Sequence, residues 1–211
     1  MQRPDPVRAV VFDFDGLLAD TEKPWGVAES AMFTTRGLHY GEAERNLFLG
    51  AAAADAAAIM ADRFGEPRPD VLAEFIARAR QQLSADSEPM PGAVAMLSGM
   101  RVPYAIASNT QRDLLDLSLA ASGLDALVPL SVSSSEVAAP KPAPDVYLRA
   151  CELLGVAPSD AVAVEDSRTG AAAARAAGLA VVMVPSGPYQ PGDADLIVNS
   201  LADPALAGWL G

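Results

Sequence analysis

Acidic and hydroxyl side chains stand directly after three short apolar runs of the sequence. These side chains are Asp13 and Asp15, Ser108 and Asn109, and Glu165 and Asp166. Like-charged carboxylates that lie close together are unfavourable unless a cation or protons neutralise them. Oxygen ligands select a hard ion, and Mg²⁺ suits a few carboxylates together with water and a substrate phosphate. The pattern therefore predicts a Mg²⁺ site that also receives a phosphate group.

A carboxylate such as Asp13 can act as a covalent nucleophile toward phosphorus. Its repulsion from a phosphate charge about 4 Å away is roughly 4 kcal/mol at an effective dielectric near 20, so positive charge is required beside it. Lys141 is available for that purpose. Asp15 can stay protonated next to the charge cluster and act as a general acid. Ser108 and the backbone N–H groups of residues 14 and 15 are candidates for holding the phosphoryl oxygens.

The elements that must position these residues alternate along the chain. Strands are expected at 7–12, 104–107, 161–164, 180–184 and 196–198, with a weaker edge strand at 127–130. Helices are expected at 92–100, 112–121, 145–154 and 168–177. This alternation predicts an α/β fold, with an open, parallel, Rossmann-like sheet and helices on both faces. Ligands of such sheets bind outside the carboxyl ends of the strands, where the acidic residues fall.

Residues 21–89 interrupt the alternation and contain no convincing strand. Their helical stretches, at 25–35, 42–48, 52–64 and 71–83, predict an inserted α-helical cap domain at 20–89. The α/β catalytic core then comprises 1–19 and 90–211. Thr21 is expected to cap the first inserted helix while facing the crevice. Trp25 can reach a substrate from the cap, although packing explains it equally well.

Composition excludes several classes of protein. Asp and Glu number 27 against 15 Lys and Arg, and the formal net charge of −12 argues against binding to nucleic acid. No apolar run reaches membrane-spanning length. One cysteine, Cys151, and one histidine, His39, exclude zinc sites built from several such ligands, and the cysteine usage favours the cytosol. We expect a cytoplasmic protein that acts on a small phosphorylated metabolite, with no nucleic-acid or membrane partner. The sequence does not fix the oligomeric state, and a monomer is favoured.

Four segments resemble, in order and spacing, the motifs of the phosphatase and phosphomutase branch of the haloacid dehalogenase superfamily. The segments are 13–22 (DFDGLLADTE), 108–109 (SN), 141–145 (KPAPD) and 165–170 (EDSRTG). The resemblance covers essentially the whole chain, and the helical insert stands where that branch carries its cap. It implies that Asp13 is a nucleophile that forms an aspartyl-phosphate, and that Asp15 is the general acid and base.

The same resemblance implies a ligand set. Mg²⁺ would be held by Asp13, by the main-chain carbonyl of Asp15 and by Asp166, with Glu165 as a ligand or an orienting group. The transferring phosphoryl group would be bound by Ser108 and Lys141, with help from Asn109.

Alternatives remain at this stage. Asp15 favours phosphoryl transfer over dehalogenation, because the haloacid dehalogenases lack this second aspartate.

Mutases similar to β-phosphoglucomutase carry a histidine where Trp25 stands and a Lys-Gly-x-x-Arg pattern where 49–53 (LGAAA) stands. The missing lysine and arginine favour simple hydrolysis. The entry to the cap at 22–25 (EKPW) resembles that of sugar-phosphate and hexitol-phosphate phosphatases, which implies a sugar or polyol phosphate as substrate. A mutase and a catalytically silent metabolite-binding module remain as alternatives. Taken alone, Asp166 would merely cap the helix that starts at 168, and Lys141 would be a surface lysine.

Overall fold

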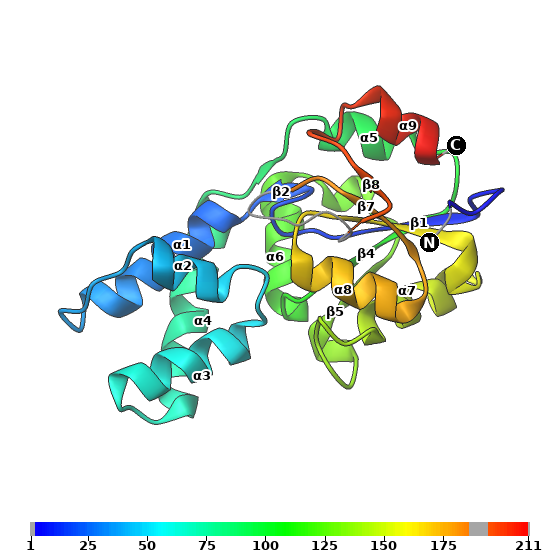
Figure 1. Ribbon diagram of the computed structural model, residues 1–211. Coiled ribbons are helices and arrows are strands. Elements are labelled where there is room, and N and C mark those ends of the chain that lie inside the picture. Colours follow the sequence, from blue (N-terminus) through cyan, green and yellow to red (C-terminus); the bar gives the residue numbers. More distant parts are fainter. Residues whose placement is uncertain (1–2, 186–193, 211) are drawn as a thin grey trace.

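A computed structural model of the chain describes residues 3–185 and 194–210, and Figure 1 shows its arrangement. Within these residues a six-stranded sheet has the order β5-β4-β1-β6-β7-β8, and every neighbouring pair is parallel. The strands are β1 (Ala9–Phe12), β4 (Tyr104–Ser108), β5 (Ser131–Ser133), β6 (Ala161–Glu165), β7 (Ala180–Met183) and β8 (Leu196–Ile197). The predicted parallel α/β fold is confirmed.

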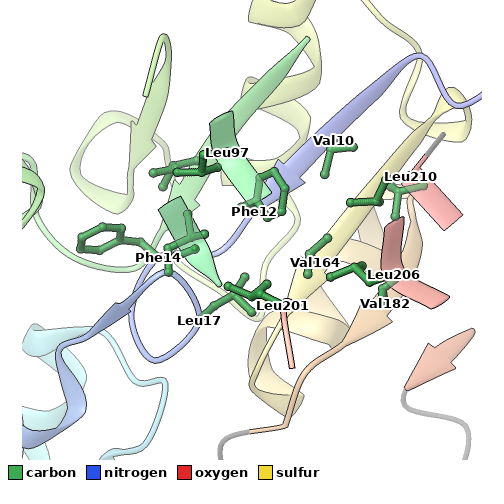
Figure 2. Packing of buried hydrophobic residues seen from close by; sticks show 14 of the residues in the cluster. Val10, Phe12, Phe14, Leu17, Leu97, Val164, Val182, Leu201, Leu206 and Leu210 are labelled. Atoms are coloured by element: carbon green, nitrogen blue, oxygen red, sulfur yellow. The ribbon is translucent and has the colours of Figure 1, made fainter. Parts of the chain in front are cut away.

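Helices cover both faces of this sheet. On one face lie α5 (Ala93–Gly99), α6 (Arg112–Ser122) and α9 (Pro204–Leu210), and on the other lie α7 (Asp145–Leu154) and α8 (Arg168–Ala177). Successive side chains of a strand point to opposite faces. Val10 and Phe12 therefore join the first apolar cluster, part of which Figure 2 shows, whereas Ala9 and Val11 join the second.

The second cluster contains many small residues at the points where helices meet strands. Ala161 and Ala163 of β6 belong to this cluster together with Ala171 and Ala174 of α8, which contacts β6. Small side chains allow a helix to approach the sheet closely. The first turn of α8 is thereby brought against the carboxyl end of β6.

Four further helices form a separate helical insert between β1 and α5. They are α1 (Glu22–Thr34), α2 (Glu42–Phe48), α3 (Ala53–Phe64) and α4 (Arg68–Ala85), and their ends agree with the predicted stretches to within three residues. Met32, Phe33, Met60 and Phe75 are fully buried in a core that is mostly the insert's own. Figure 1 shows the insert projecting from one end of the sheet.

Two short strands join the insert to the rest of the chain. β2 (Ala19–Asp20) and β3 (Glu88–Pro89) pair antiparallel, with Ala19 opposite Pro89. The expectation of no strand in 21–89 is therefore wrong at residues 88–89. A two-residue strand carries no alternation of apolar and polar side chains, so no periodic signal marks it.

Two other expectations also need correction. The edge strand lies at Ser131–Ser133 rather than 127–130, because residues 125–127 form a 3₁₀ turn and Ile106 of β4 pairs with Ser131. The sequence reading also contained no counterpart of α9. This seven-residue helix includes Pro204 and Gly208, and its burial of Leu206 and Leu210 ties it to the sheet.

The strand order fixes where a ligand can bind. β1 lies in the middle of the sheet. The strands that follow it in the chain, β4 and β5, lie on one side of β1, and the later strands, β6 to β8, lie on the other side, so the strand order reverses at β1. Ligands of open parallel sheets bind at this reversal, outside the carboxyl ends of the strands. Those ends are Phe12, Ser108 and Glu165.

Across residues 3–185 and 194–210, none of the helices combines the length and apolar character that a membrane span needs.

The burial of α9 gives a test of this packing. Leu206 is fully buried, whereas Leu148 on α7 is 43% exposed. We expect Leu206→Ala to lower the free energy of unfolding by about 2–5 kcal/mol, because it removes buried methyl groups and leaves a cavity. Leu148→Ala, the same chemical change at an exposed site, should cost less than about 1 kcal/mol. Urea unfolding measures both, and equal losses would contradict the placement of α9.

Candidate active site

Asp13 stands at the end of β1, where the chain leaves the sheet. Its backbone N–H donates to the carbonyl of Val164 at 2.9 Å, so β6 holds the residue in place. The chain then turns tightly, because the N–H groups of Leu18 and Ala19 both donate to the carbonyl of Phe14. Gly16 adopts a φ of +78°, and a Cβ there would overlap the Asp166 carboxylate. Glycine therefore serves both the turn and the close approach to β6.

Lys141 reaches Asp13 from a separate segment of the chain. Its Nζ lies 2.5 Å from Asp13 Oδ1 and 2.6 Å from Glu165 Oε1, and only 4% of the residue is exposed. The loss of water by burial opposes its charge, but the Asp13 and Glu165 carboxylates prevail and hold the pKa of Lys141 above its usual range. Lys141 is therefore a permanent cation at the floor of the site, not a surface lysine.

Three buried carboxylates surround this single ammonium group. Asp13, Glu165 and Asp166 have ligand atoms within 4.8 Å of one another. Burial raises the pKa of Asp13 to about 8, while Lys141 lowers it and Glu165 and Asp15 raise it further. With all three carboxyl groups ionised, the three carboxylates and one ammonium have a formal charge of −2, which one divalent cation would neutralise. The residues present therefore fit a hard metal ion bound through oxygen.

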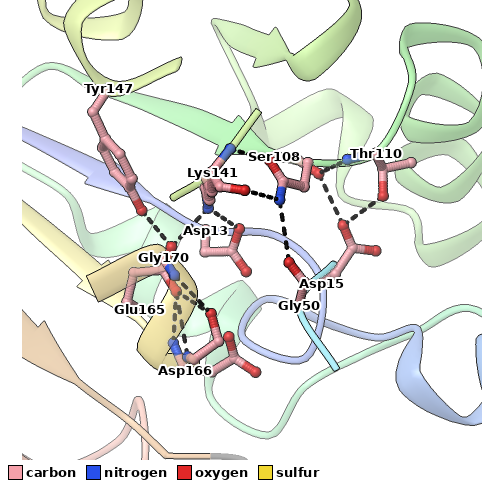
Figure 3. Close-up of polar contacts among 12 residues, drawn as sticks. Asp13, Asp15, Gly50, Ser108, Thr110, Lys141, Tyr147, Glu165, Asp166 and Gly170 are labelled. Atoms are coloured by element: carbon pink, nitrogen blue, oxygen red, sulfur yellow. Dashed lines mark hydrogen bonds and ion pairs between the residues drawn. The ribbon is translucent and has the colours of Figure 1, made fainter. Parts of the chain in front are cut away.

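Hydrogen bonds occupy both oxygens of Glu165, as Figure 3 shows. Oε1 accepts from Lys141 and from the hydroxyl of the buried Tyr147. Oε2 accepts from the backbone of Asp166 and from the backbone and hydroxyl of Ser167. A Cβ at Gly170 would overlap this carboxylate, so the first turn of α8 closes directly onto it. Glu165 thus fits an orienting role better than that of a direct ligand.

The carboxylate of Asp15 faces a different set of partners. Oδ1 accepts from the hydroxyl of Thr21 at 2.7 Å, and Oδ2 accepts from those of Ser108 and Thr110, both at 2.8 Å. Ser108 also accepts the backbone N–H of Thr110. The three hydroxyl groups hold Asp15 beside Asp13 but outside the group formed around Lys141.

Asn109 links three segments through one amide. Its Oδ1 accepts the backbone N–H of Lys141 at 2.7 Å, and its Nδ2 donates to the carbonyl of Lys141 at 3.3 Å. The same Nδ2 donates to the carbonyl of Gly50 in the helical insert at 3.1 Å. Asn109 therefore holds the Lys141 peptide and one loop of the insert at the same time.

A cavity runs from these residues into the helical insert. Asp13, Asp15, Asn109, Lys141 and Asp166 line its inner end. The insert supplies the outer end from α1, α2 and α4, with Glu22, Trp25, Glu29, Arg45, Phe48 and Phe75 among its residues. Substrate would thus be enclosed between the sheet and the insert.

Every candidate site residue predicted from the sequence lines this cavity or forms a hydrogen bond or ion pair with a residue that lines it. One capping interpretation is wrong, and the other holds for the position but not for the side chain. The N-cap of α8 is Ser167, whose hydroxyl accepts the N–H of Gly170, so Asp166 is not the cap. Thr21 does occupy the N-cap position of α1, but its side chain makes no cap hydrogen bond and is used by Asp15 instead.

Sequence reasoning did not assign Thr110, Tyr147 or Glu29 to the site. Thr110 directly follows Ser108 and Asn109, so its place in the chain was a usable signal. Tyr147 stands two residues into α7, six residues after Lys141, and faces inward with the first turn of that helix. Glu29 had no signal beyond its helical spacing of four residues from Trp25.

The Tyr147 hydroxyl supports the buried charge cluster, and its removal is measurable. We expect Tyr147→Phe to lower the free energy of unfolding by about 1.5–3 kcal/mol, because it removes a donor from a buried carboxylate. Tyr104→Phe is the matched control, since that hydroxyl donates to the neutral carbonyl of Leu127, and about 0.5–1.5 kcal/mol is expected. A Tyr147→Phe protein as stable as the control would contradict the role given to this bond.

Glu29 should make stability depend on pH. Burial raises its pKa from 4.5 to about 7, against the smaller lowering effect of the Tyr40 hydroxyl. The folded state therefore holds this proton more tightly than the unfolded chain does, and stability falls as pH rises from about 4.5 to 7. Glu29→Gln should lose the part of this pH-dependent decrease in stability that the Glu29 carboxyl causes. Glu42→Gln, at an exposed site, should keep the whole decrease. Urea unfolding at several pH values measures this, and identical slopes in all three proteins would refute it.

Comparison with known proteins gives a consistent result. CbbY from Rhodobacter capsulatus is 35% identical over 89% of this chain and 88% of its own length. A probable pseudouridine-5'-phosphatase from Drosophila melanogaster is 33% identical over 92% and 89%. The solved structure of CbbY from Rhodobacter sphaeroides in complex with phosphate superimposes with a TM-score of 0.80 at 25% identity, over 93% of this chain and 96% of that one. Other relatives are named phosphoglycolate phosphatase and β-phosphoglucomutase. The profile described as haloacid dehalogenase-like hydrolase matches residues 10–184. The chain belongs to this family of hydrolases.

Proposed function

We propose that the protein hydrolyses a small phosphomonoester, a sugar or polyol phosphate, through an aspartyl-phosphate formed on Asp13. The observation that carries this proposal is the group at the cavity floor. There the buried Asp13 carboxylate lies 2.5 Å from the buried Lys141 ammonium. The carboxylates of Glu165 and Asp166 lie beside Asp13, and Asp15 follows it by two residues in the chain. Relatives named as phosphatases act on small phosphorylated compounds, which supports the same chemistry here.

Mg²⁺ is the proposed cofactor. Asp13, Asp166 and the main-chain carbonyl of Asp15 would hold it, with Glu165 orienting the neighbouring groups. When bound, Mg²⁺ supplies positive charge that offsets the carboxylates and the phosphoryl oxygens. Lys141 and Ser108 are proposed to bind the phosphoryl group, and Asn109 to hold Lys141 for that task.

In the first step a carboxylate oxygen of Asp13 attacks phosphorus in line with the ester bond. The bond between phosphorus and the ester oxygen breaks, and the departing oxygen takes a proton from Asp15. Lys141 offsets the repulsion between the Asp13 carboxylate and the phosphate. The alcohol leaves, and the phosphoryl group remains on Asp13.

In the second step water attacks the phosphorus of the aspartyl-phosphate. Asp15, now a carboxylate, takes the proton from this water, and the bond between phosphorus and Asp13 breaks. Thr21, Ser108 and Thr110 hold Asp15 in position for both transfers. Inorganic phosphate leaves, and Asp13 is again a free carboxylate.

The helical insert is proposed to act as a cap over this reaction. Residues 20–89 would move as one domain against the core of 1–19 and 90–211, with the β2–β3 pair at the two crossings between them. Closure excludes bulk water from the intermediate and brings the insert's side chains onto the substrate.

Hydrolysis is favoured over the mutase alternative by the lining of the cavity. Leu49 and Ala53 line it at the two positions where mutases similar to β-phosphoglucomutase carry lysine and arginine. Neither side chain can bind a second phosphate. Isomerisation of a hexose phosphate in the presence of a bisphosphate primer would show the mutase to be correct instead.

The mechanism predicts the effect of removing the nucleophile. Asp13→Asn should lower phosphate release from a panel of sugar, polyol, nucleotide and glycolate phosphates by about 10³-fold or more, because the amide cannot attack phosphorus. Addition of a chelator to the unaltered protein should abolish turnover in the same assay, and Mg²⁺ should restore it.

A control separates this effect from a general loss of structure. Asp70→Asn makes the same change on the exposed side of α4 and should leave phosphate release unchanged. Circular dichroism should show that both variants fold. Turnover that survives Asp13→Asn, or tight binding of a metabolite without any turnover of the panel, would overturn the proposed function.

A further inference from the structure

The outer end of the cavity is built from residues whose function is not explained by the reaction at Asp13. Glu22, Trp25 and Glu29 stand at spacings of three and four residues on α1, so they share one face of that helix. All three line the cavity. The ring of Trp25 packs against that of Phe75, with centroids 5.4 Å apart, and Phe48 adds a third aromatic side chain to the lining. This end of the cavity therefore has an apolar lining, formed by Trp25, Phe48 and Phe75, and an acidic wall, formed by Glu22 and Glu29 on either side of Trp25 along α1.

Glu29 is the buried member of the acidic wall. Only 7% of the residue is exposed, and one of its oxygens accepts the hydroxyl of Tyr40. Among the described residues, Tyr40 is the only side chain that hydrogen-bonds this carboxylate. A carboxylate can accept about four hydrogen bonds, so Glu29 keeps acceptor capacity toward the cavity.

The charges at this end do not favour a second anion. Arg45 is the cation of the insert that lines the cavity, and its guanidinium is paired with Glu22 at 3.1 Å. Glu22 and Glu29 against Arg45 leave a formal charge of −1. Glu29 carries its charge above pH 7, since its pKa is about 7. Among the described residues that line this end of the cavity, no unpaired cation is present to receive a second phosphate or a carboxylate of the substrate.

We propose that Glu29, oriented by Tyr40, is a specificity-determining residue that selects phosphomonoesters with an uncharged, hydroxyl-bearing leaving group and rejects those that carry a second anion. A hydroxyl of the leaving group donates to Glu29, while the carbon face lies against Trp25 and Phe75. The inference rests on the proposed phosphatase function and narrows its substrate class. It also sets this chain apart from the CbbY of Rhodobacter sphaeroides, which has been solved in complex with a bisphosphate.

The test uses two substrates that differ in one group. Glycerol 3-phosphate and 3-phosphoglycerate share a carbon chain and a phosphate, but the second replaces a CH₂OH group by a carboxylate. At pH 8 with Mg²⁺, kcat/KM should favour glycerol 3-phosphate by about tenfold or more. Glu29→Gln removes the charge but keeps the size of the side chain and an acceptor for the Tyr40 hydroxyl. The ratio of kcat/KM between glycerol 3-phosphate and 3-phosphoglycerate should then fall to about threefold or less, mainly through a change in KM.

Two controls make the result specific. Glu42→Gln removes a carboxylate of α2 that does not line the cavity, and should keep the full preference. In an Asp13→Asn background, where no turnover is expected, calorimetry should show the same order of dissociation constants for the two compounds and the same narrowing by Glu29→Gln. The inference is overturned if the unaltered protein shows no preference or prefers 3-phosphoglycerate, or if Glu29→Gln and Glu42→Gln behave alike.

Hydrolysis of p-nitrophenyl phosphate separates this failure from failure of the proposed function. Its leaving group has neither a second anion nor an aliphatic hydroxyl, so it reports on the reaction at Asp13. If the unaltered protein with Mg²⁺ cleaves it but shows no preference between the glycerol compounds, the selectivity alone is refuted. If it cleaves neither p-nitrophenyl phosphate nor either glycerol compound, the phosphatase function is refuted and the selectivity with it.

Discussion

The excess of negative charge around Lys141 is the constraint on which the rest of the structure depends. Asp13, Glu165 and Asp166 are held within 4.8 Å of one another and almost fully out of water. Buried like charges are costly, and one ammonium group compensates only one of the three. The fold must therefore supply enough stability elsewhere to hold an arrangement that repels itself. The same repulsion leaves a net negative charge at the site that a bound cation would offset.

The α/β core meets this demand with close packing on both faces of a parallel sheet. Alanines on β6 and α8 bring the helix onto the strand, so that backbone and hydroxyl donors of residues 166 and 167 reach Glu165. Glycines at positions 16 and 170 remove the two Cβ atoms that would overlap the carboxylates. The polar cluster is thus held by apolar and small residues that do no chemistry themselves.

Much of this arrangement could be predicted from the sequence, because it depends on local signals. A buried strand that ends at an acidic or hydroxyl residue is marked by its composition, and parallel strands bring their carboxyl ends to one edge of the sheet. Asp13 and Asp166 could therefore be placed together without coordinates, whereas Lys141 follows no predicted strand and was placed only by the resemblance of residues 141–145 to a family motif. The four insert helices were also visible, since each carries a periodic apolar face.

The remainder depended on contacts between distant segments. Neither the pairing of Ala19 with Pro89 nor the docking of Leu206 leaves a periodic pattern in so short an element. The choice of Ser167 over Asp166 as the α8 cap follows from the geometry at the end of β6, which one sequence does not reveal. Glu29 is an ordinary helix residue until α1 is packed over the core, and only then does it line the cavity.

The side-chain amide of Asn109 connects the helical insert to the α/β core. One nitrogen is shared between the carbonyl of Gly50 in the insert and that of Lys141 in the core. If the insert moves as the proposed cap does, a displacement of the Gly50 loop away from the sheet breaks the first contact, while Oδ1 of Asn109 still accepts the Lys141 N–H. The amide that holds the Lys141 peptide is thus also the point at which the core would register the position of the proposed cap.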